Sequence, residues 1–302
     1  MSNQKRAVAL GFFDGVHRGH AALLERVKER AAEISAEPTV LTFDVHPDTL
    51  VFGKDVPLIN SAPEREEILR RIYGIDSTIF LHFNRSLMQM PWEDFIASAV
   101  KELNIGAVVV GHDFSFGYRG QGTPERLRDW CTKRGIGCDV IPAVRIDGRI
   151  VSSTEIRTLI ATGQIEEANR LLGHPHTLSD VIHSGFHLGA KLGSPTINMA
   201  FPDGVVIPKH GVYSARVYLD DGSDYIAVTN IGVRPTVSDS NRVSVESHLL
   251  DFSGNLYGHH ARVEFCHFQR PERKFENTEE LSAQIKKDAA DAAAWFRDNP
   301  ED

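Results

Sequence analysis

The first half of the chain alternates short apolar segments with longer segments whose apolar residues recur at helical spacing. Buried strands are expected at residues 7–12, 39–43, 78–83, 107–110 and 137–144, which are short and rich in apolar and β-branched residues. Helices are expected at residues 20–34, at 92–103 and from 124 onward, where a proline suits the first helical position. Strands that alternate with helices predict a Rossmann-like parallel sheet covered by helices, an α/β domain spanning residues 1–170.

The pattern changes after Arg157. One or two helical turns at 158–172 lead into Gly173-His174-Pro175-His176, whose composition predicts a linker. Strands then follow at residues 211–219, 225–230, 243–250 and 261–268, with turns rather than helices between them. An Ala-rich segment at 279–296 predicts a terminal helix. We therefore expect an antiparallel β-barrel or sandwich over residues 180–302, with the barrel preferred.

The composition is that of a globular protein of about two domains. The chain has 302 residues, of which 41% are hydrophobic and 25% charged, with a formal net charge of −8. This charge does not favour wholesale binding to nucleic acid or to an anionic membrane. No window approaches the ~20 apolar residues of a membrane helix. The apolar run near residue 10 is too short and too early for a secretory signal. Three cysteines without a CxxC pair predict buried thiols and a cytoplasmic location; the oligomeric state is left open.

The strongest local motif follows the first expected strand and opens the first helix. It reads Gly11-Phe12-Phe13-Asp14-Gly15-Val16-His17-Arg18-Gly19-His20. Gly11, Gly15 and Gly19 permit turns that let backbone N–H groups approach a phosphate at a helix N-terminus. His17 and His20 project to one face, where imidazoles can stabilise charge on a transferred phosphorus and on leaving pyrophosphate. The alternative is a glycine-rich turn with two hydrogen-bonded histidines, and zinc is disfavoured because no third ligand is evident.

This segment resembles the (H/T)xGH signature of the nucleotidyltransferase superfamily, and Val151-Ser152-Ser153-Thr154-Glu155-Ile156-Arg157 resembles its second signature. The resemblance implies that Ser153 and Thr154 bind phosphate oxygens and that Arg157 clamps the β- and γ-phosphates. Residues 111–117, which contain Asp113, are similar to a loop of the bacterial FAD synthetase module, and residues 42–47 match its segment after the second strand. From that family, Phe12, Asp14 and Asp113 are assigned to ATP binding and His46 to flavin binding. For His46 a strand end with a proline stop is an equal alternative.

Residues 189–198, Gly189-Ala190-Lys191-Leu192-Gly193-Ser194-Pro195-Thr196-Ile197-Asn198, resemble the nucleotide motif of riboflavin kinase. The resemblance implies that Thr196 and Asn198 hold Mg²⁺, for which neutral oxygen ligands are suitable, and that Gly189, Lys191 and Gly193 contact the phosphates. Residues 230–236, which contain Arg234, resemble a further segment of that family and imply a flavin contact. Residues 245–252 resemble its catalytic strand, on which Glu246 and His248 share one face while Val243, Val245, Ser247 and Leu249 share the other. Glu246 is then the general base; otherwise it is an exposed partner of Arg234 or Arg242.

Together the matches run from about residue 8 to 288 and resemble the bacterial bifunctional riboflavin kinase and FAD synthetase family. The resemblance implies that riboflavin is phosphorylated by ATP to FMN, which is then adenylylated by ATP to FAD with release of pyrophosphate. The chain departs from the family pattern at Phe12, Glu155, Ala190 and Ser194. Glu155 places an acid near the expected triphosphate, which favours weak adenylyl transfer. Two alternatives remain: a riboflavin kinase with a weakened or differently specific transferase domain, and a flavin-sensing protein that binds without turnover.

Two other groups of side chains receive structural interpretations. His174, His176, His183 and His187 straddle the expected linker without cysteine or carboxylate support, so a metal role is not favoured. The charged segments at residues 64–71 and 126–134 are interpreted as solvated helix faces.

Overall fold

The computed structural model describes residues 4–53, 55–183, 196–233 and 243–300. The chain divides into two compact units, Met1–Ser153 and Thr154–Asp302. No helix within the described ranges is long and apolar enough to cross a membrane.

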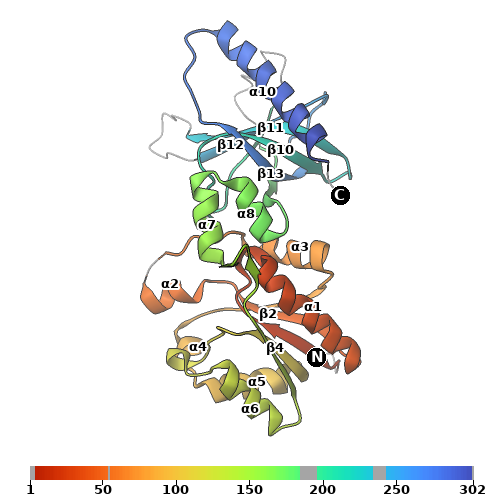
Figure 1. The fold of residues 1–302 in the computed structure, drawn as a ribbon, viewed down its shortest axis with the longest axis vertical. Coiled ribbons are helices and arrows are strands. Elements are labelled where there is room, and N and C mark those ends of the chain that lie inside the picture. Colours follow the sequence, from red (N-terminus) through yellow and green to blue (C-terminus); the bar gives the residue numbers. More distant parts are fainter. Residues whose placement is uncertain (1–3, 54, 184–195, 234–242, 301–302) are drawn as a thin grey trace. The chain divides into compact units, whose positions relative to one another are not determined.

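The first unit is built on a parallel sheet, of which Figure 1 labels β2 and β4. Its strand order is β3-β2-β1-β4-β5. Its strands are β1 (Arg6–Leu10), β2 (Glu37–Phe43), β3 (Ser77–Leu81), β4 (Ile105–Gly111) and β5 (Gly137–Ile141). The predicted parallel sheet is therefore confirmed, although β5 ends three residues before the expected Val144. The chain leaves β1 toward β2 on one side and later returns as β4 on the other. In open parallel sheets, ligands bind beyond the carboxyl ends of the strands at such a reversal.

Helices cover both faces of this sheet. They are α1 (Arg18–Glu33), α2 (Pro47–Phe52), α3 (Ala62–Tyr73), α4 (Arg85–Gln89), α5 (Trp92–Leu103) and α6 (Pro124–Thr132), with short turns η1 (Asp14–Val16) and η2 (Tyr118–Gly120) and a small hairpin of β6 (Arg145–Ile146) and β7 (Arg149–Ile150). The core on one face joins Ala7 and Ala9 to α1 and α3, and the core on the other joins Val8 and Leu10 to α5 and α6. Burial on both faces explains why β1 is apolar throughout rather than alternating.

The helix α7 (Ser153–Thr162) crosses the boundary at its first residue, and the second unit continues with α8 (Ile165–Leu172) and an antiparallel sheet. The strand order is β8-β13-β10-β11-β12-β9, and an isolated bridge links Asn198 on β9 to His183, two residues beyond the end of β8. The strands are β8 (His176–Val181), β9 (Thr196–Met199), β10 (Gly211–Leu219), β11 (Asp224–Val233), β12 (Val243–Leu249) and β13 (His260–Arg270), followed by α10 (Thr278–Asp298). The predicted barrel with a terminal helix is confirmed.

The segment expected to be a linker is packed into this unit. Gly173 ends α8 in the left-handed conformation (φ 85°), and His174 and His176 are buried immediately after it. Asn169 fastens α8 to the barrel, since its Nδ2 donates to Phe265 O at 2.7 Å and its Oδ1 accepts from His176 N at 2.8 Å. The connection from α8 to β8 is therefore short and anchored.

The imidazole of His176 gives the barrel a pH-dependent stability. Its ring stacks on Phe201 and Phe265, with centroids 6.2 and 5.9 Å away, and among the described residues neither ring nitrogen has a hydrogen-bond partner. Burial, and secondarily His174, lowers the pKa of His176 from 6.5 to about 3. The unfolded chain therefore binds more protons between these two values, and the free energy of unfolding falls as the pH falls from 6.5 toward 3.

We expect His176→Phe, which keeps an aromatic ring in the stack, to remove up to about 1.4 kcal/mol per pH unit of this dependence. The measurement is urea unfolding at several pH values between 7 and about 4, with the exposed His260→Phe as control. Equal loss of stability on acidification in wild type and His176→Phe would contradict the assignment.

Candidate active sites

The loop after β1 is fixed by contacts with distant parts of the first unit. Phe13 and Gly15 adopt left-handed conformations (φ 57° and 77°). The Asp14 carboxylate is buried and accepts from Ile59 N at 2.8 Å, while Ser153 Oγ donates to Asp14 O at 3.0 Å. This hydrogen bond brings together the two motifs that resemble nucleotidyltransferase signatures, residues 11–20 and residues 151–157. Asp14 and Ser153 are 139 residues apart in the chain.

The two histidines of this loop lie against each other at the start of α1. His17 caps the helix, since its Nδ1 accepts from His20 N at 3.3 Å, and the two rings stack with centroids 3.7 Å apart. A Cβ at Gly19 would lie 2.9 Å from His17 Cε1, so the missing side chain makes room for the His17 ring. Likewise, a Cβ at Gly11 would lie 3.0 Å from the Phe13 ring. These two glycines are required by close approach of aromatic rings.

His20 is held in its neutral form. Burial, followed by the neighbouring His17 and Arg65, lowers the pKa of His20 well below its usual value of 6.5. Its Nδ1 is buried and has no hydrogen-bond partner among the described residues. A neutral imidazole carries one N–H donor and one lone pair, so His20 can contact a phosphate as a hydrogen-bond donor but not as a cation.

Arg65 is a residue of this site that the sequence interpretation missed. The segment 64–71 was expected to be a solvated face, but Glu64 and Arg65 are buried, so that prediction is wrong for both. Glu64 closes a capping box with Ser61 at the start of α3. Arg65 donates to Phe12 O at 2.6 Å and to Phe43 O at 2.8 Å, and burial lowers its pKa to about 10, which leaves it protonated at pH 7.

The Phe12 ring is the centre of a group of aromatic and cationic side chains. The Arg65 guanidinium lies 4.5 Å from its centroid, and the His46 ring meets it edge-on at 4.6 Å. His46 also caps α2, since its Nδ1 accepts from Asp48 N at 3.1 Å. The departure of residue 12 from the family pattern therefore has a structural consequence: the phenyl ring joins the glycine-rich loop to His46 and Arg65.

Other residues predicted for this chemistry lie beyond β4 and on α7. The Asp113 side chain is 83% exposed, and its Oδ1 is 3.8 Å from His112 Nδ1. On α7, Arg157 Nη2 donates to Thr154 Oγ1 at 3.1 Å, and both belong to the second compact unit.

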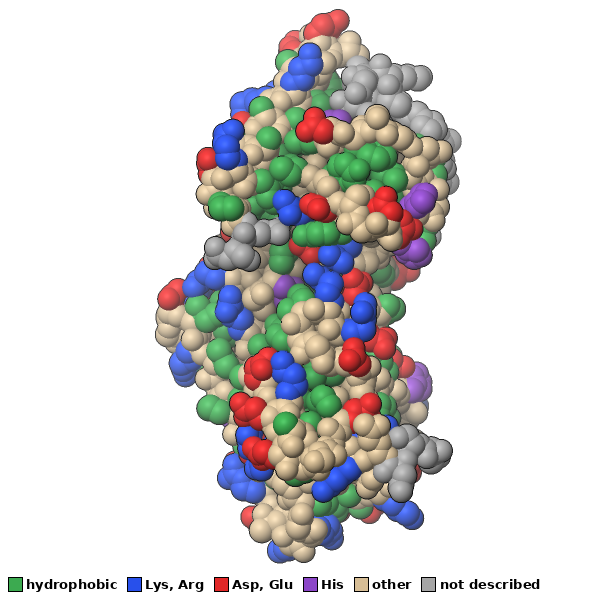
Figure 2. Space-filling model, turned by 90° about the vertical axis from the view of Figure 1, so that its right-hand side faces the viewer, with side chains coloured by type: hydrophobic (Ala, Val, Ile, Leu, Met, Phe, Trp, Pro, Cys, Tyr) green, Lys and Arg blue, Asp and Glu red, His purple; other side chains and the backbone are tan. Residues whose placement is uncertain are grey.

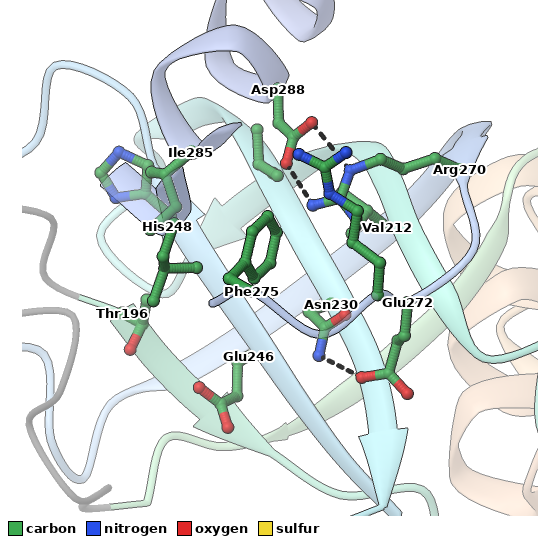
Figure 3. A pocket seen from close by; sticks show the side chains of 13 residues that line it. Thr196, Val212, Asn230, Glu246, His248, Arg270, Glu272, Phe275, Ile285 and Asp288 are labelled. Carbon is green, nitrogen blue, oxygen red and sulfur yellow. Dashed lines mark hydrogen bonds and ion pairs between the residues drawn. The ribbon is translucent and has the colours of Figure 1, made fainter. Parts of the chain in front are cut away.

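A pocket of about 260 Å³ lies on the outer face of the barrel sheet, against α10 (Figure 3). Polar side chains of β9, β11 and β12 form one part of its wall, including Thr196, Asn230, Glu246 and His248. Phe275, Leu281 and Ile285 supply apolar surface. A cavity with an apolar wall and a few converging polar groups has the form of a small-molecule site.

The register of the strands places the predicted kinase residues side by side. Glu246 is directly opposite Asn198 on β9 and Asn230 on β11, and His248 is opposite Thr196. Opposed residues in an antiparallel pair point to the same face, and so do residues two apart. Val245, Ser247 and Leu249 are buried on the other face, so the expected division of this strand is confirmed for them. Thr196, Asn198 and Glu246 therefore share one surface.

An ion pair that was not anticipated holds α10 at this pocket. Arg270 donates two hydrogen bonds to the buried Asp288 carboxylate, from Nε to Oδ1 at 3.0 Å and from Nη2 to Oδ2 at 2.6 Å. Gln284 Nε2 donates to Oδ1 of the same carboxylate at 2.6 Å. Arg270 lies at the end of β13 and Asp288 on α10, and the sequence gives no local signal for their contact. Arg273 adds a hydrogen bond to Gln284 Oε1 at 2.6 Å.

Several predicted residues lie outside the described ranges: Gly189, Lys191, Gly193 and Arg234, with the departures Ala190 and Ser194. Arg242, a proposed alternative partner of Glu246, lies there too, as does His187.

Within the described part of the chain there is no group of three His, Cys, Asp or Glu side chains suited to a metal. His183 Nε2 lies 3.4 Å from Asp180 Oδ2. Of the cysteines, Cys131 and Cys266 are buried and Cys138 is half-buried. On the face drawn in Figure 2, side chains of both charges are interspersed.

Two family models match different parts of the chain. A model of the FAD synthetase family matches residues 1–155, and a model of the riboflavin kinase family matches residues 172–296. A bifunctional riboflavin kinase/FMN adenylyltransferase of Listeria monocytogenes is 32% identical over 96% of this chain and 92% of its own length. The chain belongs to this family. The corresponding protein of Pseudomonas fluorescens is 35% identical over 94% of this chain and 91% of its own.

The comparisons support a bifunctional enzyme, a transferase with riboflavin kinase and FMN adenylyltransferase activities. They do not support the two alternatives, a riboflavin kinase with a weakened or differently specific transferase domain and a flavin-sensing protein. A crystal structure named as a macrolide-efflux protein from Streptococcus pneumoniae has a TM-score of 0.87 and 27% identity, covering 98% of this chain and 96% of that one. That name is a statement about the other protein, and the similarity concerns the fold that it shares with this family member.

Proposed function

We propose that the barrel pocket is the riboflavin kinase site of this family member and that Glu246 is its general base. The observation that supports this most directly is the position of Glu246, between Asn198 and Asn230 on a sheet face that also carries Thr196. The isoalloxazine ring of riboflavin packs against Phe275, Leu281 and Ile285, and its ribityl chain reaches Glu246. Glu246 takes the proton of the terminal hydroxyl as that oxygen attacks the γ-phosphorus of ATP, and ADP leaves.

Thr196 and Asn198 are proposed to hold Mg²⁺ together with ATP. The donor set fits: a hydroxyl and a carboxamide oxygen on one strand face, beside a carboxylate, are the hard oxygen donors that Mg²⁺ prefers. The bound ion would neutralise charge on the phosphate oxygens. We assign Gly189, Lys191 and Gly193 to the phosphates and Arg234 to the flavin by their family resemblance.

The first unit is proposed to carry adenylyl transfer. A phosphate oxygen of FMN attacks the α-phosphorus of ATP, a P–O bond forms there, and pyrophosphate leaves. His17 and His20 lie beside these phosphates, where the neutral His20 donates a hydrogen bond to the developing charge. His46 contacts the flavin, which its position against Phe12 supports. Arg157 is assigned to the β- and γ-phosphates by its family resemblance alone. The remaining ATP-binding residues are proposed to be Gly11, Phe12, Asp14, Gly15, Gly19, Asp113, Ser153 and Thr154. Asp14 is proposed to act indirectly, by holding the loop in place through its buried hydrogen bond from Ile59 N.

As functional modules, residues 1–170 are proposed to carry adenylyl transfer and residues 180–302 the kinase. The partners are small molecules, ATP, riboflavin and FMN, and the proposed compartment is the cytoplasm.

The first test is to incubate the protein with riboflavin, ATP and Mg²⁺ and to separate the flavins by chromatography. We expect FMN to form first and FAD to follow. FMN without FAD would show that the first unit is not an FMN adenylyltransferase, and unchanged riboflavin would refute the assignment of both sites. Repeating the incubation with EDTA tests the metal, since removal of the divalent ion is expected to stop both reactions.

A further inference from the structure

Asn230 is oriented by a carboxylate from a distant part of the chain. Its Nδ2 donates to Glu272 Oε1 at 3.0 Å, and both side chains line the barrel pocket (Figure 3). A carboxylate has no proton to donate, so the amide nitrogen must face Glu272 and the carbonyl Oδ1 must point away from it. Within the described part of the chain, Oδ1 has no hydrogen-bond partner of its own. Glu272 therefore fixes the orientation of the Asn230 amide so that its Oδ1 can accept a hydrogen bond from a ligand.

Gly232 makes this contact possible. A Cβ at residue 232 would lie 2.1 Å from Glu272 Oε1, so any side chain there would displace the carboxylate. Gly232 and Asn230 are two residues apart on β11 and face the same side of the sheet. The Glu272 carboxylate consequently lies on the strand surface next to Asn230.

Asn230 also lies next to the proposed base. It is the residue directly opposite Glu246 on the adjacent strand, and such pairs have Cβ atoms about 4.5–5.5 Å apart. The Asn230 carbonyl and the Glu246 and Glu272 carboxylates thus form a group of neighbouring acceptors at one side of the pocket. Neighbouring acceptors suit a ligand with successive hydroxyl donors, which is a polyol. An alkyl chain at the same place would leave these groups desolvated without partners.

We propose that Asn230, positioned by Glu272, binds the secondary hydroxyls of the ribityl chain and makes the kinase selective for a polyol tail. This inference rests on the proposed function, in which the pocket binds riboflavin and Glu246 receives the terminal hydroxyl proton. Asn230 touches the substrate, whereas Glu272 acts through Asn230 and is a positioning residue.

The test compares two substrates with ATP and Mg²⁺: riboflavin, and an isoalloxazine whose tail is an unbranched hydroxypentyl chain with only the terminal hydroxyl. We expect wild type to prefer riboflavin in kcat/KM by about 10-fold or more, because a site built for hydroxyls rejects an analogue that lacks them. Asn230→Ala should reduce this preference by about 10-fold, through loss of activity on riboflavin and not on the analogue. Glu272→Gln should reduce it in the same direction but less, since glutamine can still accept from Asn230. The control Asp291→Asn, at an exposed ion pair with Lys287 on α10, should leave it unchanged.

Equal losses on both substrates in Asn230→Ala would overturn the proposal and leave a structural role for the residue. So would tight binding of both flavins to wild type with equal affinity, measured by quenching of flavin fluorescence, which requires no variant. If Asn230→Ala does not fold, the preference of Glu272→Gln for riboflavin over the analogue in kcat/KM is the test, and an unchanged preference would overturn the proposal. Failure of wild type to phosphorylate riboflavin would instead count against the proposed function, so the two failures are distinguishable.

Discussion

Replacing Glu246 by glutamine is expected to lower FMN formation by about 10²–10⁴-fold, because an amide cannot take the proton of the attacking hydroxyl. The side chain keeps its size and its place between Asn198 and Asn230, so the fold and the affinity for riboflavin should change little. The loss should therefore appear in kcat rather than in KM. The measurement is steady-state phosphorylation of riboflavin, together with adenylylation of FMN that is supplied externally.

The adenylylation rate is the internal control for Glu246→Gln. The proposed base belongs to the barrel, whereas the loop that carries His17 and His20 belongs to the other compact unit. A matched substitution is Asp224→Asn, which makes the same chemical change at an exposed ion pair with Arg216 at the start of β11. It should retain kinase activity. Near wild-type turnover of Glu246→Gln would mean that another group receives the proton.

The division between the two faces of β12 could be predicted from sequence because it depends on local periodicity. In a strand of period two, burial of Val245, Ser247 and Leu249 places Glu246 and His248 on the opposite face, whatever the neighbouring strands are. The parallel sheet was predictable for a similar reason, since apolar runs alternate with helical segments. The order of the strands was not, because it depends on contacts between segments far apart in the chain.

Buried charges were the part of the sites that local pattern misrepresented. Arg65 lies in a segment rich in Glu and Arg, which is typical of a solvated helix face, yet its guanidinium is buried against two backbone carbonyls and the Phe12 ring. Its partners are 53 and 22 residues away, so no periodicity reports them. Glu272 is exposed, but its partner Asn230 is likewise distant, 42 residues away, and no periodicity reports it. Buried polar groups are specified by three-dimensional partners, and these become visible only in the structure.

Truncation of His20 is expected to separate the two activities in the opposite direction. In the structure its imidazole is half-buried, neutral and stacked on His17 at the start of α1, the place where a phosphate is favoured by free backbone N–H groups. Removal of one preorganised donor to a developing charge costs about 3–4 kcal/mol of transition-state stabilisation. His20→Ala should therefore lower FAD formation by about 100-fold or more, and riboflavin should accumulate as FMN because the kinase pocket is unchanged.

A purely structural role for His20 predicts a different result for the same variant. Loss of the stacked ring would lower the melting temperature and would reduce both activities by similar, small factors. Measuring kinase rate, adenylyl transfer rate and melting temperature on one preparation distinguishes the two cases, and His82→Ala provides a control at a histidine whose side chain is 71% exposed in the same unit. FAD synthesis by His20→Ala at more than about a third of the wild-type rate, far short of the loss expected for a preorganised donor, would refute the proposed chemistry of the first unit.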